Sequence, residues 1–152
     1  MRKTISFLLI LTLIVVALPT DAHALDNSLD SNTMTFEDGS YIRITVEEVF
    51  VRATNTKNGY KTYSYYDASN NLDWQAKLSA SFSYNGTTST CTSASCTVTI
   101  YDSSWFESSN TTTRSGSTAT TYLVMGRKLL GVTVSQLDYT ITLTCDKDGN
   151  LS

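Results

Sequence analysis

The segment Trp74–Tyr84 alternates strictly between apolar and polar side chains. Successive side chains of a β-strand point to opposite faces, so this pattern predicts a strand with one buried face and one solvated face. Asn85 and Gly86 follow directly, and because both residues tolerate positive φ they predict a tight hairpin turn. We therefore expect an antiparallel partner strand over Thr87–Thr92.

Several other segments show the same two-residue period or are rich in residues that favour strands. They are Tyr41–Val46 with a continuation over Val49–Arg52, Tyr60–Tyr66, Cys96–Tyr101, Thr118–Met125, Leu129–Val134 and Tyr139–Cys145. Turn residues separate them, and no apolar period of helical length interrupts the series. About seven to nine short strands of this kind predict an all-β fold: an antiparallel two-sheet β-sandwich, immunoglobulin-like or related, rather than a barrel.

Residues 1–24 have the three parts of a secretory signal peptide. Two basic residues precede an apolar run that is too short to span a bilayer, and Ala22 and Ala24 offer a small-residue cleavage site. Cleavage after Ala24 removes 24 of the 152 residues and leaves 128, about the size of one domain. We expect a protein secreted from the cell, with a polar lead-in over 25–39, a single sandwich domain over 40–146 and a polar tail over 147–152.

The composition narrows the chemistry that the chain can perform. Only 16% of the residues are charged, and the formal net charge of −3 becomes −4 once Arg2, Lys3 and Asp21 are removed. A weakly acidic protein is a poor partner for nucleic acid, and we expect no membrane contact after cleavage of the leader. His23 is the only histidine, so the mature chain can hold neither a Ser–His or Cys–His pair nor a histidine-ligated metal. We therefore expect no catalysis, no metal and no cofactor.

Three cysteines, Cys91, Cys96 and Cys145, lie in the mature chain, and an extracellular destination would permit disulfides. Small residues separate Cys91 from Cys96 at the neck of an expected hairpin, where opposed strand residues lie about 4.5 to 5.5 Å apart, a separation that suits a disulfide. This geometry predicts a Cys91–Cys96 bridge, with a bridge from Cys145 to one of the two as the alternative. Cys145 otherwise falls on the inward register of its strand, and we expect a buried thiol rather than an intermolecular bond.

No charged residue occurs from Leu78 to Tyr101. A charge-free segment of high β propensity would be an aggregation hazard as a free edge, because open edges pair with other chains. We therefore expect this segment in the middle of a sheet, or guarded by a covalent clip.

Several motifs extend from the strand at Trp74 to the end of the chain. They are W-x-A-x-L-x-A-x-F-x-Y-N-G from Trp74, C-x-x-x-x-C-x-V-x-I-Y-D-x-x-W from Cys91, the segment Leu130–Val134 and the ending Leu143–Ser152. Together they resemble a group of small secreted proteins of anaerobic Gram-positive bacteria, especially gut Clostridia, over most of the mature chain. The resemblance implies a secreted β-rich fold, and it carries over no catalytic residue and no activity.

Paired carboxylates are the remaining candidates for catalysis or for metal binding. They are Glu47 with Glu48, Asp102 with Glu107, and Asp146 with Asp148. Glu47 and Glu48 would point to opposite faces of a strand, and solvated surface charge is the expected role of all these groups. The spacing Asp146-x-Asp148-x-Asn150 imitates the first ligands of a calcium-binding loop, but Leu151 stands where that loop needs glycine. We therefore expect a polar turn there.

Aromatic residues are the most suggestive feature for binding, because rigid rings supply contact area at a low entropic cost. In the strand over 60–66, the alternation places Tyr63 and Tyr65 on one face. Tyr60 and Tyr66 then lie on the other face. Our candidate binding residues are Tyr63, Tyr65, Trp105 and Phe106, of which the last two are expected in a loop. Packing in the core or along an edge is the alternative role.

These features predict a secreted, non-catalytic binding or interaction module whose partner is a glycan, a cell-wall component or an extracellular protein. A structural or self-assembling surface protein is the alternative, because strands rich in hydroxyls and poor in charge suit both roles. A small hydrolase is a third interpretation, which the lack of histidine disfavours. We expect a monomer or a weakly self-associating protein.

Overall fold

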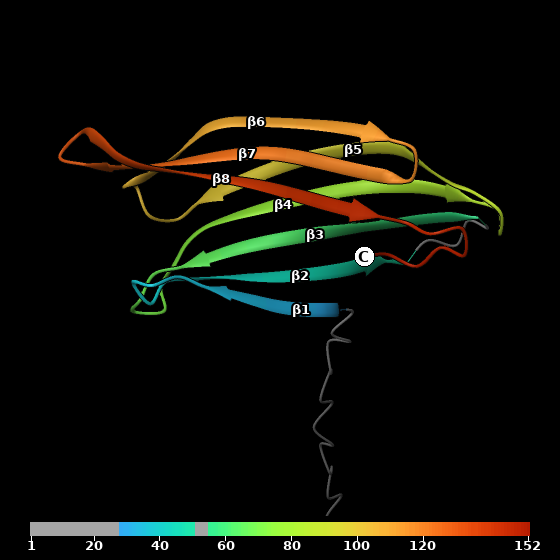
Figure 1. Cartoon of the computed structure of the whole chain (residues 1–152), viewed down its shortest axis with the longest axis horizontal. Coiled ribbons are helices and arrows are strands. Elements are labelled where there is room, and N and C mark those ends of the chain that lie inside the picture. Colours follow the sequence, from blue (N-terminus) through green and yellow to red (C-terminus); the bar gives the residue numbers. More distant parts are fainter. Residues whose placement is uncertain (1–27, 51–54) are drawn as a thin grey trace, which may run out of the picture.

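The computed structural model describes residues 28–50 and 55–152, so the expected signal peptide lies outside the described residues. Within these ranges, eight antiparallel strands form two sheets that pack face to face (Figure 1). The strands are β1 (Ser28–Thr35), β2 (Tyr41–Val49), β3 (Thr56–Tyr66), β4 (Leu72–Tyr84), β5 (Ser89–Ile100), β6 (Trp105–Ser115), β7 (Thr118–Leu129) and β8 (Val132–Thr144). The predicted antiparallel β-sandwich is confirmed.

The larger sheet has the order β1-β2-β3-β4-β5 and the smaller sheet the order β6-β7-β8. Within each sheet every strand therefore pairs with its neighbour in the chain, and both sheets are meanders, whereas immunoglobulin domains use Greek-key connections. Consecutive strands linked by short turns pair directly, which explains this order. The smaller sheet packs over β3, β4 and β5, so the inner face of β1 and β2 has no strand opposite it within the described residues.

The predicted alternation of β4 is confirmed. Trp74, Leu78 and Phe82 on its inner face have no exposed surface. They pack in one apolar cluster with residues of the smaller sheet, among them Leu123, Met125, Ile141 and Leu143. Removal of these side chains from water supplies the main favourable free energy for holding the two sheets together.

The segment from Ser89 to Ile100 forms one continuous strand, which corrects the expected hairpin around the cysteines. Thr92–Ser95 contains no glycine, proline, asparagine or aspartate that would favour a turn. Its small side chains instead continue the pairing with equally small residues of β4. The pairs are Ser79 with Ser95, Ala80 with Ala94, and Ser81 with Ser93.

The predicted Cys91–Cys96 disulfide is wrong. The two cysteines are five residues apart along β5, which corresponds to roughly 15 Å and far exceeds the separation that a disulfide allows. A register shift opposite Ser81 and Phe82 marks a bulge, and this extra residue turns both cysteines to the inner face. All three cysteines are free thiols, with Cys145 buried as its inward register predicted.

We expect thiol reagents to leave all three cysteines nearly unmodified in the folded protein at neutral pH and to modify all three after unfolding. Cys91 and Cys145 are buried and Cys96 is half-buried. Desolvation raises the pKa of each thiol, so the reactive thiolate is scarce. Alkylation with excess iodoacetamide, with and without urea and in the absence of reductant, can be read by intact mass. A pair of cysteines that stays unmodified in urea would reveal a disulfide and contradict the free thiols.

Three other segments differ from the sequence prediction. β1 lies within the segment expected to be a polar lead-in, and Trp105 and Phe106 begin β6 instead of lying in a loop. Leu129–Val134 is not one strand, because β7 ends at Leu129 and a tight turn at Leu130 and Gly131 leads into β8. The sequence did not predict this turn, because Leu130, with a φ of 51°, occupies a position that ordinarily takes asparagine or glycine.

Candidate binding face

The structure places Tyr63 and Tyr65 on the inner face of β3. Tyr65 lies opposite Trp74 in the pairing with β4, its ring stacks on the Trp74 ring at 5.5 Å between centroids, and it is only 5% exposed. Tyr63 lies opposite Ala76 and is half-buried against the core. The smaller sheet covers this side of β3, so Tyr65 packs in the core and Tyr63 lies partly exposed at its margin. Packing in the core or along an edge, the alternative role, therefore describes both rings.

Trp105 is also buried, with 4% of its surface exposed. Its ring packs against Tyr65 and Trp74, and its indole N–H donates a hydrogen bond to Oδ2 of Asp73 at 2.9 Å. Asp73 is itself buried, and burial raises its pKa while the hydrogen bond from Trp105 opposes the rise. The pair therefore holds the start of β6 against β4. Nothing in the local sequence pattern distinguished Asp73 from a surface carboxylate.

Phe106 packs along the smaller sheet. It is half-buried, and its ring occupies the space in which a Cβ at Gly126 of β7 would stand. The Nζ atom of Lys128 lies 4.5 Å from the centroid of the same ring. A large ring over a glycine of the paired strand restores the contact area that the glycine lacks. Phe106 thus contributes to strand packing.

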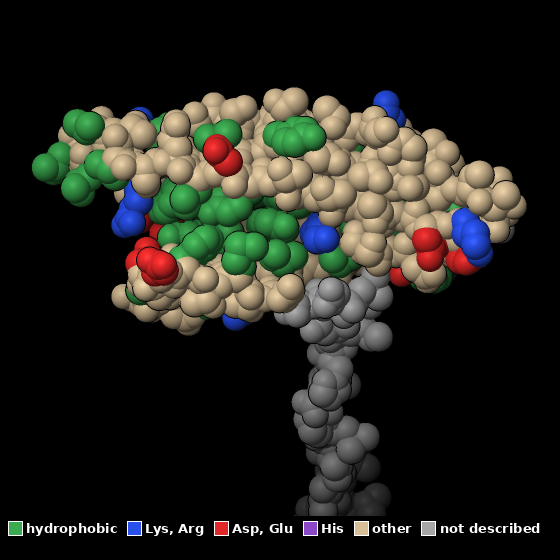
Figure 2. All heavy atoms as spheres, in the orientation of Figure 1, with side chains coloured by type: hydrophobic (Ala, Val, Ile, Leu, Met, Phe, Trp, Pro, Cys, Tyr) green, Lys and Arg blue, Asp and Glu red, His purple; other side chains and the backbone are tan. Residues whose placement is uncertain are grey.

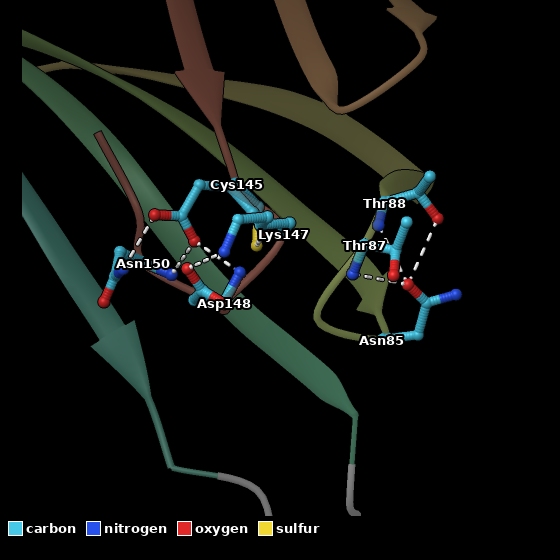
Figure 3. A network of polar contacts seen from close by, with 8 residues as sticks. Asn85, Thr87, Thr88, Cys145, Lys147, Asp148 and Asn150 are labelled. Carbon is cyan, nitrogen blue, oxygen red and sulfur yellow. Dashed lines mark hydrogen bonds and ion pairs between the residues drawn. The ribbon is translucent and has the colours of Figure 1, made fainter.

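The aspartates of the suspected calcium loop are engaged in a turn, as expected. Asp146 Oδ1 accepts hydrogen bonds from the N–H groups of Asp148 at 2.8 Å and Asn150 at 2.9 Å (Figure 3). The side-chain amide of Asn150 also donates to Asp146 Oδ2 at 2.7 Å. This side-chain bond, followed by the backbone bonds, lowers the pKa of Asp146, and together they occupy the oxygens that an ion would need. The same arrangement recurs at Asp67 in the turn between β3 and β4. No group of three or more histidine, cysteine, aspartate or glutamate residues in the described part of the chain could hold a metal ion.

The adjacent carboxylates Glu47 and Glu48 point to opposite faces of β2, as predicted. Glu48 forms an ion pair with Lys57 of β3. Glu47 lies opposite Tyr60 on the outer face of the larger sheet. The two groups therefore do not face one another across a cleft, as the carboxylates of a glycosidase must.

The outer face of the larger sheet carries rows of hydroxyl side chains. Between β4 and β5 the outward pairs are Gln75 with Thr99, Lys77 with Thr97, Ser79 with Ser95, Ser81 with Ser93, and Ser83 with Thr90. On the neighbouring strand β3, Tyr60 lies opposite Ser79, and Asn58 lies opposite Ser81. Tyr60 is thus on the solvent side of β3, opposite to the side that buries Tyr65.

A groove of about 330 Å³ lies on this face. The lining residues are Val49, Asn58, Gly59, Tyr60, Lys77, Ser79, Ala80, Ser81, Ser93 and Ser95. The sheet is hollowed here because the serines have small side chains, whereas Tyr60 and Lys77 beside them are large. The Nζ atom of Lys77 lies 3.3 Å from the centroid of the Tyr60 ring, so a cation–π contact holds the two side chains together. We call this feature the Tyr60 groove.

The Tyr60 groove is polar and nearly neutral. Lys77 is the only charged side chain among its lining residues. Burial, together with the charge and hydrogen bond of Glu47, raises the pKa of Tyr60, so its hydroxyl keeps its proton. The Oδ1 atom of Asn58 is buried and has no hydrogen-bond partner within the described residues. An unpaired buried acceptor costs free energy.

A second hollow of about 260 Å³ follows at the end of the β4–β5 hairpin. Its lining residues are Asn55, Ser83, Tyr84, Asn85, Thr88 and Thr90. The turn is held by Asn85, whose Oδ1 accepts hydrogen bonds from the N–H groups of Thr87 at 3.0 Å and Thr88 at 2.8 Å (Figure 3). The outward residues of β4 and β5 therefore connect two polar hollows along one face of the hairpin.

The described residues contain no helix that is long and apolar enough to cross a membrane. Comparisons with protein-family models, with curated proteins and with solved structures find no match for this chain.

Proposed function

We propose that this chain is a secreted, non-catalytic binding module that recognises a carbohydrate through the Tyr60 groove. The observation that carries the proposal is a hollow of about 330 Å³ in which a tyrosine and a lysine flank a surface of serines. Ligand sites are usually concave and combine apolar contact area with a few placed polar groups. The Tyr60 groove combines these two features on an otherwise even sheet.

The polarity of the groove favours a neutral polyhydroxylated ligand. Serine hydroxyls both donate and accept hydrogen bonds, and Lys77 adds donors. The Tyr60 ring supplies apolar surface for the C–H groups of a sugar ring. A strongly anionic ligand would need more than one cation, and Lys77 stands alone among the lining side chains.

The proposed extracellular setting rests on the leader sequence and on the nature of the surface. Residues 1–24 carry the features of a secretory signal, and glycans and cell-wall polymers are abundant outside cells. The lining of the groove includes neither a carboxylate nor a histidine, so it offers no general acid or base of the usual kinds. Binding without chemistry is the role that fits these residues.

We expect Tyr60→Ala to weaken carbohydrate binding by about 30-fold, the loss typical of a ring that anchors a ligand. A glycan array identifies the ligand, and titration calorimetry with that ligand compares the variant with the wild type. Tyr60 is outward and only partly buried, so circular dichroism should show an unchanged fold.

Tyr122→Ala is the matched control. Tyr122 is 55% exposed on β7 in the other sheet, and the same ring is removed. Equal affinity of the Tyr60→Ala variant and the wild type would contradict the proposed groove, and a wild type that binds no glycan or cell-wall polymer would overturn the carbohydrate assignment.

A further inference from the structure

β8 is the outer strand of the smaller sheet, and most of its outer edge has no strand partner in the described residues. At its C-terminal end, Ser152 folds back and exchanges two backbone hydrogen bonds with Thr144, at 2.9 and 3.1 Å. The other 12 residues of β8, 132–143, present free N–H and C=O groups along this edge within the described residues. Such an edge is a template for pairing with another strand.

The edges at β5 and β6 face one another and are protected, whereas no strand of the described residues covers the edge of β8 in this way. β5 and β6 lie along one another, with Asn110 Nδ2 donating to the Cys96 carbonyl at 3.2 Å and Arg114 donating to the Thr92 carbonyl. β5 is an outer strand of the larger sheet, so the expectation that the charge-free segment lies in the middle of a sheet or behind a covalent clip is wrong for this strand. The contacts with β6 protect it instead. β8 contains no lysine, arginine or proline, and Asp138 is its only charged residue. The usual devices that prevent edge-to-edge pairing are therefore nearly absent from β8.

The hairpin between β7 and β8 extends past the rest of the sandwich (Figure 1). Its apolar side chains are exposed. The exposed fractions are 64% for Leu129, 98% for Leu130, 66% for Val132 and 55% for Val134. Leu130 also adopts a positive φ that disfavours a branched side chain. Neither burial nor backbone preference accounts for leucine here, so a contact outside the molecule is the remaining physical reason. We call residues 129–134 the apolar arm.

A strip of apolar surface lies beside β8, between the two sheets (Figure 2). It exists because the smaller sheet does not extend over β1 and β2. Ile44, Tyr63, Leu137 and Tyr139 pack on the core but remain partly exposed, and Met34 of β1 is 47% exposed. The rings of Tyr63 and Tyr139 meet across the strip at 6.4 Å between centroids. A strand added to β8 would cover this strip.

We infer that a second copy of this chain occupies the β8 edge, so that two β8 strands pair antiparallel about a twofold axis into one six-stranded sheet. Antiparallel pairing places the N-terminal part of one β8, with its apolar arm, beside the middle of the other β8, where Leu137 and Tyr139 border the strip. No charge occurs from Leu129 to Leu137, so a second copy of this segment meets no electrostatic opposition. The apolar arm of each copy, which has no contact within its own chain to account for it, thus covers the apolar strip of the other copy. The contact is reciprocal.

The test is the mass of the mature chain in solution, measured by light scattering after size-exclusion chromatography over a range of concentrations. We expect a dimer in the wild type and a mass that halves in the double variant Val132→Lys and Val134→Lys, because lysines on an edge block strand pairing. Both valines are more than half exposed, so the variant should keep the circular dichroism spectrum of the folded wild type. Backbone amides of 132–140 should exchange hydrogen faster in the variant than in the dimeric wild type.

Thr113→Lys on the exposed part of β6 is the matched control and should remain dimeric. A wild type that stays monomeric at all concentrations would overturn the inference, as would a dimer that survives both lysines or dissociates in the control. Binding of the wild-type monomer to lipid vesicles through Leu130 would reassign the apolar arm to a membrane surface. Carbohydrate affinity per chain should be equal in the wild type and the double-lysine variant. A result that overturns the dimer is therefore distinct from a result that overturns carbohydrate binding at the Tyr60 groove.

Discussion

Replacing Trp74 with alanine is expected to lower the free energy of unfolding by about 3 to 5 kcal/mol. Trp74 has no exposed surface, and its ring packs against Tyr65 of its own sheet at 5.5 Å and Tyr139 of the opposite sheet at 5.4 Å between centroids. The variant leaves a cavity between two hydrogen-bonded sheets, which cannot close around it without disturbing strand pairing. Urea unfolding followed by circular dichroism measures the loss.

Tyr122→Ala serves as the control, because it removes a ring of comparable size from the solvent side of β7. Its cost should stay within about 0.5 kcal/mol. Equal unfolding midpoints for the two variants would contradict the inward register of β4.

Trp105→Ala is expected to cost a similar amount, about 3 to 5 kcal/mol, since it removes a second ring from the same cluster. It also takes away the hydrogen-bond donor of the buried Asp73 carboxylate. A thermal or urea melt at neutral pH measures the change. A fully folded Trp105→Ala variant of wild-type stability would return Trp105 to the surface role that the sequence alone indicated.

Trp105→Phe separates the hydrogen bond from the ring and should cost about 1 to 3 kcal/mol at pH 7. Burial raises the folded-state pKa of Asp73 above its unfolded value, so the stability linked to this group is fully present below the unfolded pKa and is lost as pH rises through the folded pKa. The Trp105 N–H lowers the folded-state pKa of Asp73. Its removal therefore raises this pKa further and increases the stability that is lost at neutral pH. We expect Trp105→Phe to be less harmful at pH 3.5 than at pH 7.

The control for this pH dependence is Asp73→Asn, which removes the titrating group. In the Asp73→Asn background, Trp105→Phe should lower the free energy of unfolding by the same amount at pH 3.5 and at pH 7. A Trp105→Phe variant with the same cost at pH 3.5 and pH 7 would contradict the coupling of the two residues.

The local sequence pattern predicted a strand correctly where the alternation of apolar and polar residues agreed with the turn residues that follow. β4 and the turn after it were predicted because eleven alternating residues lead into Asn85 and Gly86, and the inward position of Cys145 follows from the same alternation in β8. The segment Thr92–Ser95 lacked such agreement, since small polar residues suit a loop and a strand equally. Only its pairing with the serines and alanines of β4 made it a strand, and the predicted disulfide failed with the hairpin.

The sequence by itself determined that β3 has two tyrosine faces, with Tyr63 and Tyr65 on one and Tyr60 on the other, because a strand repeats every two residues. It could not determine which face meets solvent, since alternation is unchanged when the two faces are exchanged. The packing of the smaller sheet decided this, burying Tyr65 beside Trp105 and leaving Tyr60 at the groove. Asp73 and Trp105 are likewise 32 residues apart, and only the stacking of two sheets brings the carboxylate to its donor.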